Sequence, residues 1–270
     1  MDHSVSADVI HAWVVDYMKE RQKVMTPSEL CMEIRNTWGF DRKQSRAIIN
    51  KLVSQGDIEY QDLYGRTCLS ISFSRPVRIS ANVILKPPDV EYSSDFGENV
   101  VSLHKGIAFG RGTHPTTRLS ILALSFLFEM NEKTNHSITH ALDIGTGTGV
   151  LAIVASKLGA KHVLAIDIDP VSVSEAEENV KINHLSENIT VSDKFIDFEM
   201  YNLIIANLRF PTLLDFQEPI ARMISPKGLI VLSGIKNEEK EKIMNAYKFN
   251  HGKLIWEKSE SGWCALVFRY

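Results

Sequence analysis

Apolar residues recur at helical spacing along the first third of the chain. Residues 8–20 (DVIHAWVVDYMKE) carry them on one face and predict a helix. Residues 26–35 (TPSELCMEIR) open with a threonine, a proline and then a glutamate, which is the pattern of a capped helix start. Residues 41–56 (DRKQSRAIINKLVSQG) predict a third helix whose inner face carries Ala47, Ile48, Leu52 and Val53.

A β-hairpin is expected after these helices. Residues 57–72 (DIEYQDLYGRTCLSIS) alternate between apolar and polar positions on both sides of Tyr64-Gly65. Helices followed by a hairpin resemble a winged helix-turn-helix, so we expect such a domain over residues 1–75. Residues 76–99 are rich in turn formers and predict a connector with one embedded strand.

Strand and helix signals alternate in the remaining region, residues 100–270. Strands are expected over 140–145, 162–169, 188–193, 201–208, 228–235, 253–260 and 263–270, and helices over 117–128, 150–159, 170–183, 212–224 and 237–247. This alternation is typical of an α/β fold with a doubly wound, mostly parallel, seven-stranded sheet. The last two strands, joined at Ser261-Gly262, predict an antiparallel hairpin at the sheet edge.

Composition narrows the class of protein. The chain has 270 residues, of which 44% are hydrophobic, enough for one large core and a smaller second one. Its apolar runs are too short for a membrane span and its first residues lack a signal-peptide pattern, so we expect a cytoplasmic protein without a membrane partner. Cys31, Cys68 and Cys264 lie far apart, which predicts reduced thiols and no metal site.

Positive charge gathers locally in residues 41–54, although the net charge of the chain is −3. The basic side chains are Arg42, Lys43, Arg46 and Lys51. Residues 1–80 hold eleven Lys and Arg against ten Asp and Glu, so a solvated face or a protein-docking surface is the favoured interpretation. Binding of DNA or another nucleic acid through this stretch is the alternative.

A glycine-rich stretch, DIGTGTG, follows the first strand of the α/β region. A dinucleotide fold needs GxGxxG, and Val150 stands where its third glycine would be. The D-x-G-x-G-x-G form resembles motif I of class I S-adenosylmethionine-dependent methyltransferases. In that resemblance Gly145, Gly147 and Gly149 let the backbone approach the cofactor, and Asp143 lies near the cofactor's amino-acid end. A turn used only for packing is the alternative.

Acidic residues follow the next strands. Asp167 stands at the tip of the second strand, where a carboxylate can accept both ribose hydroxyls of an adenosine. We assign the neighbouring Asp169 to capping the helix that starts at Pro170. Asp193, after the third strand, is either an adenine contact or an exposed loop residue.

The fourth strand ends in Asn207-Leu208-Arg209-Phe210. Many amino-group methyltransferases have Asn or Asp, two prolines and an aromatic residue at this place, and hold the acceptor nitrogen there. Asn207 and Phe210 keep that spacing, but Leu208 and Arg209 replace the prolines. This departure argues against an enzyme that methylates adenine in DNA or RNA, and it is compatible with a different amine as the methyl acceptor.

The stretch 106–117 (GIAFGRGTHPTT) precedes a long apolar helix and by itself predicts a turn. Together with DIGTGTG, AIDIDP, IIANL, LSGI and WCALVFR it resembles the PrmA family, which methylates a protein of the large ribosomal subunit. The resemblance covers about residues 95–270. It implies that the stretch covers the cofactor, S-adenosyl-L-methionine. The cofactor-contacting positions of the family are matched by Thr117, Gly145, Asp167 and Asn207.

The same resemblance suggests roles at the acceptor end. Asn207 would orient the amine and Phe210 would pack on its stem, which makes them the expected catalytic residues. For His114 a structural role in its turn is favoured over a general base. Trp263 and Cys264 are assigned to packing.

The resemblance implies an enzyme that methylates a protein amine, a lysine or an N-terminus, with a ribosomal protein as the first candidate. Its N-terminal third differs from the family's substrate-recognition domain, so the substrate is less constrained than the cofactor. Two alternatives remain open: a winged-helix regulator of DNA or protein that senses the cofactor, and a small-molecule methyltransferase.

Overall fold

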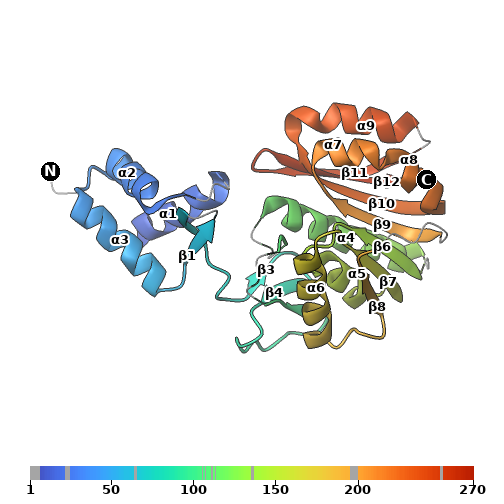
Figure 1. The fold of residues 1–270 in the computed structure, drawn as a ribbon, viewed down its shortest axis with the longest axis horizontal. Helices are drawn as coiled ribbons and strands as arrows, with labels where there is room; N and C mark the ends of the chain where they lie inside the picture. Colours follow the sequence, from blue (N-terminus) through green and yellow to red (C-terminus); the bar gives the residue numbers. More distant parts are fainter. Residues whose placement is uncertain are drawn as a thin grey trace. The chain divides into compact units, whose positions relative to one another are not determined.

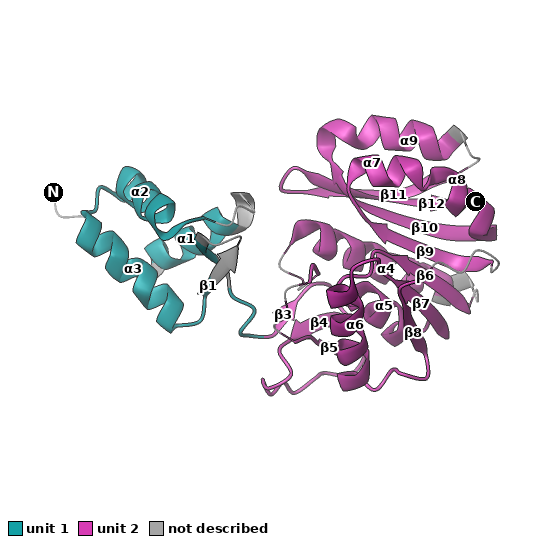
Figure 2. Cartoon of the chain, viewed as in Figure 1, with its two compact units in different colours: residues 1–75 teal, residues 76–270 magenta. Residues whose placement is uncertain are grey.

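The computed structural model divides into two compact units, residues 1–75 and 76–270 (Figures 1 and 2). The residues it describes are 7–21, 25–63, 66–104, 106, 108–110, 112, 114–134, 137–194, 200–249 and 252–270. None of the helices in these ranges combines the length and apolar character that a membrane crossing requires.

The first unit contains helices followed by a hairpin. Its described elements are α1 (Ala7–Arg21), α2 (Pro27–Trp38), α3 (Arg42–Ser54), β1 (Ile58–Leu63) and β2 (Arg66–Ile71). Thr26 begins α2 and Asp41 begins α3, each within a reciprocal capping box. β1 and β2 pair antiparallel, so the expected helices and hairpin are confirmed. The turn residues Tyr64 and Gly65 lie outside the described residues.

A small core holds this unit together, with Leu30, Ile34 and Leu52 fully buried. The expectation that Ala47 faces inward is wrong, because Ala47 is exposed and Ile49 is 2% exposed. The buried residues of α3 are Ser45, Ile49 and Leu52, which lie on one face of the helix at helical spacing. α3 packs against α2 and β1. The winged helix-turn-helix interpretation of this unit stays a prediction.

A small sheet opens the second unit. It contains β3 (Val77–Arg78), β4 (Val83–Lys86) and β5 (Asn99–Ser102), and β4 pairs antiparallel with β3 and parallel with β5. The expected connector over residues 76–99 therefore lies within this unit, and the embedded strand foreseen there is β4. β3 spans two residues, which is too short for an alternating sequence pattern to predict it.

The main sheet has seven strands in the order β11-β12-β10-β9-β6-β7-β8. They are β6 (His140–Ile144), β7 (His162–Ile166), β8 (Ile189–Ser192), β9 (Tyr201–Asn207), β10 (Ile224–Lys236), β11 (Lys253–Glu260) and β12 (Trp263–Arg269). β12 runs antiparallel to both β10 and β11, and the pairs among β6 to β10 are parallel. This is the expected α/β, doubly wound fold of class I methyltransferases.

Helices cover the sheet in two groups (Figure 1). The described helices are α4 (Pro115–Thr134), α5 (Val150–Lys157), α6 (Pro170–Ile182), α7 (Phe210–Asp215), α8 (Gln217–Met223) and α9 (Lys240–Phe249). α5 packs against both α4 and α6, and α7 packs against both α8 and α9. The single helix expected over 212–224 is two short helices that meet at Phe216. A large core cluster, with Leu142, Ile204 and Leu232 among its members, lies along the central strands.

Candidate functional site

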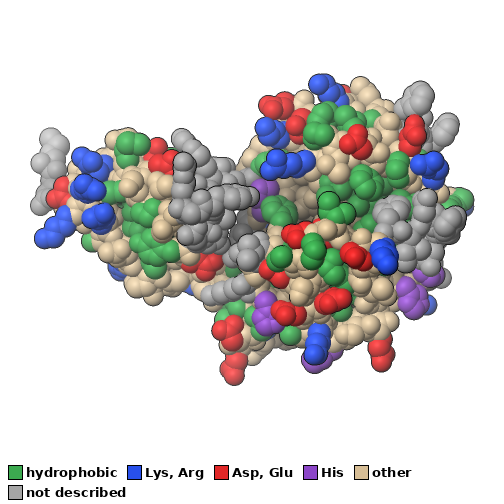
Figure 3. Space-filling model, in the orientation of Figure 1, with side chains coloured by type: hydrophobic (Ala, Val, Ile, Leu, Met, Phe, Trp, Pro, Cys, Tyr) green, Lys and Arg blue, Asp and Glu red, His purple; other side chains and the backbone are tan. Residues whose placement is uncertain are grey.

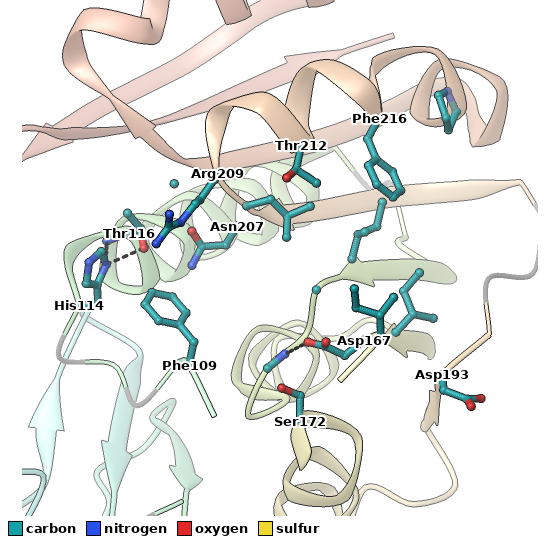
Figure 4. Close-up of a pocket in the computed structure, with 18 of the residues that line it drawn as sticks. Phe109, His114, Thr116, Asp167, Ser172, Asp193, Asn207, Arg209, Thr212 and Phe216 are labelled. Atoms are coloured by element: carbon teal, nitrogen blue, oxygen red, sulfur yellow. Dashed lines mark hydrogen bonds between the residues drawn. The ribbon is translucent and has the colours of Figure 1, made fainter. Parts of the chain in front are cut away.

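A cavity of about 1060 Å³ lies at the carboxyl ends of the parallel strands (Figure 4). In a doubly wound sheet the ligand crevice is found at this edge, where the strand order reverses. β6 supplies its glycine turn, β7 its aspartate and β9 its asparagine. Lining residues include Phe109, His114, Thr116, Gly145, Gly147, Asp167, Ile168, Ser172, Asp193, Asn207, Leu208, Arg209, Thr212, Phe216, Pro219, Arg222 and Trp263.

The turn after β6 requires glycine for two reasons. Gly147 has φ +55°, in the left-handed region, and a Cβ there would overlap the carbonyl oxygen of Phe109. Gly145 has φ +70° and lies against Leu208. Both glycines line the cavity, whereas Gly149 lies behind it and packs on Ala176 of α6. The structure thus separates two cavity glycines from a packing glycine.

Asp167 is tied to the glycine turn. Its Oδ2 accepts a 2.9 Å hydrogen bond from the Gly147 amide, and its Oδ1 accepts a 3.0 Å bond from the Asp169 amide. Asp169 in turn accepts from the Val171 amide and caps α6, the role expected from the sequence. Beside Asp167, the side chain of Ile168 is 94% exposed and lines the cavity, as does Asp193. This end offers a carboxylate with free lone pairs next to an apolar surface.

Asp143 lies beneath the turn and does not line the cavity. It is fully buried, and Oδ2 accepts a 2.6 Å hydrogen bond from the Thr146 hydroxyl. Burial raises the pKa of Asp143 to about 7, against the opposing effect of the Thr146 bond. Its carboxyl therefore supports the backbone of the turn from behind.

Residues 108–110 lie against the glycine turn and α6. The Thr148 amide donates to the Phe109 carbonyl at 2.9 Å, and the Ala108 amide donates to Oε2 of Glu175 on α6 at 2.9 Å. Ile107, Arg111 and Thr113, which belong to the stretch expected to cover the cofactor, lie outside the described residues. The described part of the segment brings the Phe109 ring to the cavity.

Aromatic residues form one wall of the cavity. The ring of His114 lies edge-on to Phe109, with centroids 5.0 Å apart, and to Trp263, at 5.4 Å. Its Nδ1 accepts from the Thr116 amide at 3.2 Å and lies 2.7 Å from the Thr116 hydroxyl, so the ring caps the start of α4. Burial lowers the pKa of His114, which favours the neutral ring.

Trp263 and Thr117 differ in whether they line the cavity. Trp263, expected to serve in packing, lies on the cavity, whereas Cys264 beside it is fully buried in the core. Thr117, expected to contact the cofactor, is fully buried and does not line the cavity, whereas its neighbour Thr116, 1% exposed, does; the contact of Thr117 stays a prediction. The Thr117 hydroxyl has no hydrogen-bond partner among the described residues.

Asn207 and Arg209 mark the end of β9. Both line the cavity, and in Figure 4 the Arg209 side chain extends toward Asn207 and Thr116. Phe210 does not line the cavity. It begins α7, packs against the core, and lies under Lys242 of α9 with Nζ 5.9 Å from its ring centroid. Phe109, from a distant part of the chain, lines the cavity with an aromatic ring where Phe210 does not.

The far wall comes from α7 and α8 and was not foreseen from the sequence. Thr212, Phe216, Pro219 and Arg222 line it. The sequence signal that could have found them is the break at Phe216 and Pro219 inside a stretch that otherwise predicts one helix. Residues of both short helices, and Phe216 between them, therefore line the cavity.

Comparison with known proteins identifies the second unit. Residues 70–270 match the family described as "Ribosomal protein L11 methyltransferase (PrmA)". Proteins named Ribosomal protein L11 methyltransferase from Geotalea uraniireducens (strain Rf4) and Listeria welshimeri are each 36% identical to this chain, over 204 and 200 residues. These alignments cover 73% and 72% of this chain and 65% and 61% of the relatives.

A solved structure agrees with this result. The ribosomal protein L11 methylase from Lactobacillus delbrueckii subsp. bulgaricus has 29% sequence identity and a TM-score of 0.64, covering 72% of this chain and 97% of its own. The chain spans less than two thirds of the length of the curated relatives named above. Since the family match extends over the whole second unit, the chain belongs to the ribosomal protein L11 methyltransferase (PrmA) family.

Proposed function

We propose that the chain is an S-adenosyl-L-methionine-dependent methyltransferase that acts on a protein amine, with a ribosomal protein as its acceptor. One observation carries the proposal: a single cavity joins the Gly145–Gly147 turn, Asp167 and Asn207 at the carboxyl ends of three parallel strands. Family membership and the names of the relatives support the same reaction and acceptor.

The residues present suit the cofactor. Gly145 and Gly147 line the cavity without side chains, and Asp167 retains acceptor capacity beyond its two amide bonds. The apolar side chain of Ile168 suits an adenine face, and Asp193 lies at the same end. The Thr117 hydroxyl, which has no hydrogen-bond partner among the described residues, lies in the first turn of α4 next to the cavity-lining Thr116, where the positive end of the helix dipole favours a carboxylate.

Methyl transfer makes few chemical demands on the protein. The cofactor supplies a methyl group activated on a sulfonium, so positioning and an amine with a free lone pair are the main requirements. The side-chain oxygen of Asn207 can accept a hydrogen bond from that amine. The guanidinium of Arg209, on the same cavity wall, disfavours a second positive charge beside it and so favours the neutral amine.

The aromatic wall limits water at the acceptor end. Phe109 and His114 belong to one short stretch of the chain and Trp263 to its last strand, and the ring of His114 contacts both of the other rings. A low-polarity wall lowers the pKa of a neighbouring lysine ammonium because burial disfavours its charged form. This supports an amine acceptor that enters without its proton.

The proposal is tested in two steps. Calorimetric titration with S-adenosylhomocysteine is expected to show binding to the wild type and a loss of at least tenfold for Asp167→Ala, while Asp89→Ala, an exposed carboxylate away from the cavity, binds normally. Purified protein and labelled S-adenosylmethionine are then added to a lysate from a strain without this protein, and protein, nucleic-acid and small-molecule fractions are separated.

Label in a ribosomal protein band supports the full proposal. Label in small molecules or nucleic acid instead would assign another acceptor to the same cavity. Cofactor binding without methyl transfer to any fraction would favour the cofactor-sensing regulator. Equal binding of S-adenosylhomocysteine by the wild type and by Asp167→Ala would contradict the assignment of this cavity as the cofactor site. The cytoplasmic location expected from the sequence stays a prediction.

A further inference from the structure

Positive charge is concentrated on α3, in the unit that lies almost entirely outside the family match. Residues 1–75 hold ten Lys and Arg and ten Asp and Glu, so this unit is neutral as a whole. Between Arg42 and Ser54, however, the helix contains four basic residues and no acidic one. Figure 3 shows Lys and Arg side chains gathered around the beginning of this helix. The positive charge of this unit is therefore concentrated on α3, without acidic residues in the same helix.

These cations are free to meet a ligand. Arg42, Lys43, Arg46 and Lys51 are all exposed. Within the described part of the chain none of them forms an ion pair. The nearest acid in sequence, Asp41, uses Oδ1 to accept a 2.7 Å bond from the Gln44 amide at the helix start. By contrast, Arg75 of the same unit is paired with Asp57.

The face is hollow. A depression of about 560 Å³ is lined by Arg42, Lys43, Arg46, Ala47 and Asn50. Arg42, Arg46 and Asn50 follow one another at four-residue spacing, so they form a row along one side of the helix. The short side chain of Ala47, beside the row, leaves room for a ligand. Arg and Lys only donate hydrogen bonds, so a matching ligand must present several acceptor oxygens along its length.

The composition of the face identifies the class of partner. Cores of protein–protein interfaces are rich in aromatic residues and depleted in lysine, whereas nucleic-acid interfaces are polar and strongly positive. Ala47 is the sole apolar residue among those that line the depression. We propose that this face of α3 binds the phosphate backbone of a nucleic acid, without reading its sequence. The proposal concerns the first unit and is independent of the proposed methyl transfer.

The test is fluorescence anisotropy with the full chain and fluorescein-labelled oligonucleotides of mixed sequence, one a single-stranded RNA and one a duplex DNA of equal length. The test variant is Arg42→Gln/Arg46→Gln. The control is Lys161→Gln/Lys253→Gln, which removes the same charge from exposed positions of the second unit. Circular dichroism and urea unfolding check that both variants fold, and the single variant Lys43→Gln provides a milder change on the same face.

Wild type and control are expected to bind, and the Arg42/Arg46 variant to bind about tenfold more weakly or worse. Its plot of log affinity against log salt is expected to be shallower by about 1.4 to 1.8, the contribution of two phosphate contacts. A preference between the two probes distinguishes RNA from DNA as the source of the backbone. Equal affinity of wild type and variant overturns the proposal, and so does competition by poly-glutamate as effective as that by unlabelled oligonucleotide, which would assign the face to acidic proteins.

Discussion

Substitution of Gly147 by alanine is the sharpest probe of how the cavity is built. Gly147 has φ +55°, and its missing side chain is what allows the Phe109 carbonyl to lie against the turn. Real Cβ atoms essentially never come closer than 3.0 Å to such an atom, so the Phe109 backbone must move in the variant. That movement lengthens the 2.9 Å hydrogen bond from the Thr148 amide beyond normal range.

The expected cost has two parts. An alanine in the left-handed region costs about 1 to 2 kcal/mol, partly offset by lower entropy of the unfolded chain. Loss of the Thr148 to Phe109 bond adds about 1 kcal/mol. Gly97→Ala isolates the first part, because Gly97 has φ +84° and nothing lies within 4 Å of a Cβ built there. We therefore expect Gly147→Ala to lose about 1 kcal/mol more stability than Gly97→Ala.

Binding separates the two variants further. Displacement of Phe109 disturbs a cavity wall, so we expect Gly147→Ala to bind S-adenosylhomocysteine about tenfold more weakly, which corresponds to about 1.4 kcal/mol. Gly97→Ala is expected to bind normally. Urea unfolding measures the stabilities and isothermal titration calorimetry measures the affinities. Equal losses in both variants would refute the argument, since they would show that backbone strain alone matters and that Phe109 does not shape the site.

Three further predictions concern ionisable groups of the cavity region. The folded-state pKa of Asp143 is about 7 against 3.8 for the free group, so the fold is stabilised by the protonated carboxyl at low pH. This stabilisation is lost as pH rises from about 4 to 7, and urea unfolding should show a decrease in the free energy of unfolding of up to about 4 kcal/mol over this range, which Asp143→Asn abolishes. In a methyl-transfer assay, Arg209→Gln should move the acid limb of the pH profile of kcat/KM up by about half a unit, and Arg209→Lys should not; an unmoved limb in Arg209→Gln would exclude an effect of its charge on the acceptor. Trp263→Ala should expose the ring of His114 and raise its pKa toward the ordinary value, as measured by NMR titration, and an unchanged pKa would mean that other groups desolvate the ring.

The sequence by itself determined the features that depend on near neighbours and on topology. The capping box of Thr26 and Glu29 begins α2, and Asp169 begins α6, as their spacing predicts. Alternating strands and helices require a doubly wound sheet, and the carboxyl ends of parallel strands share one edge. For this reason the order of residues along the chain is enough to assign the motif around Gly145, together with Asp167 and Asn207, to one site.

Tertiary structure alone decided which side chains face that site. Phe210 follows β9 in sequence but begins α7 and packs away from the cavity, while Phe109 and Trp263 reach it from opposite ends of the second unit. Packing also decided that Ala47 is exposed, because the contacts of α3 with α2 and β1 determine which face of this helix is buried. Local pattern reports that a residue is apolar, but the direction of its side chain depends on the packing of segments that are distant along the chain.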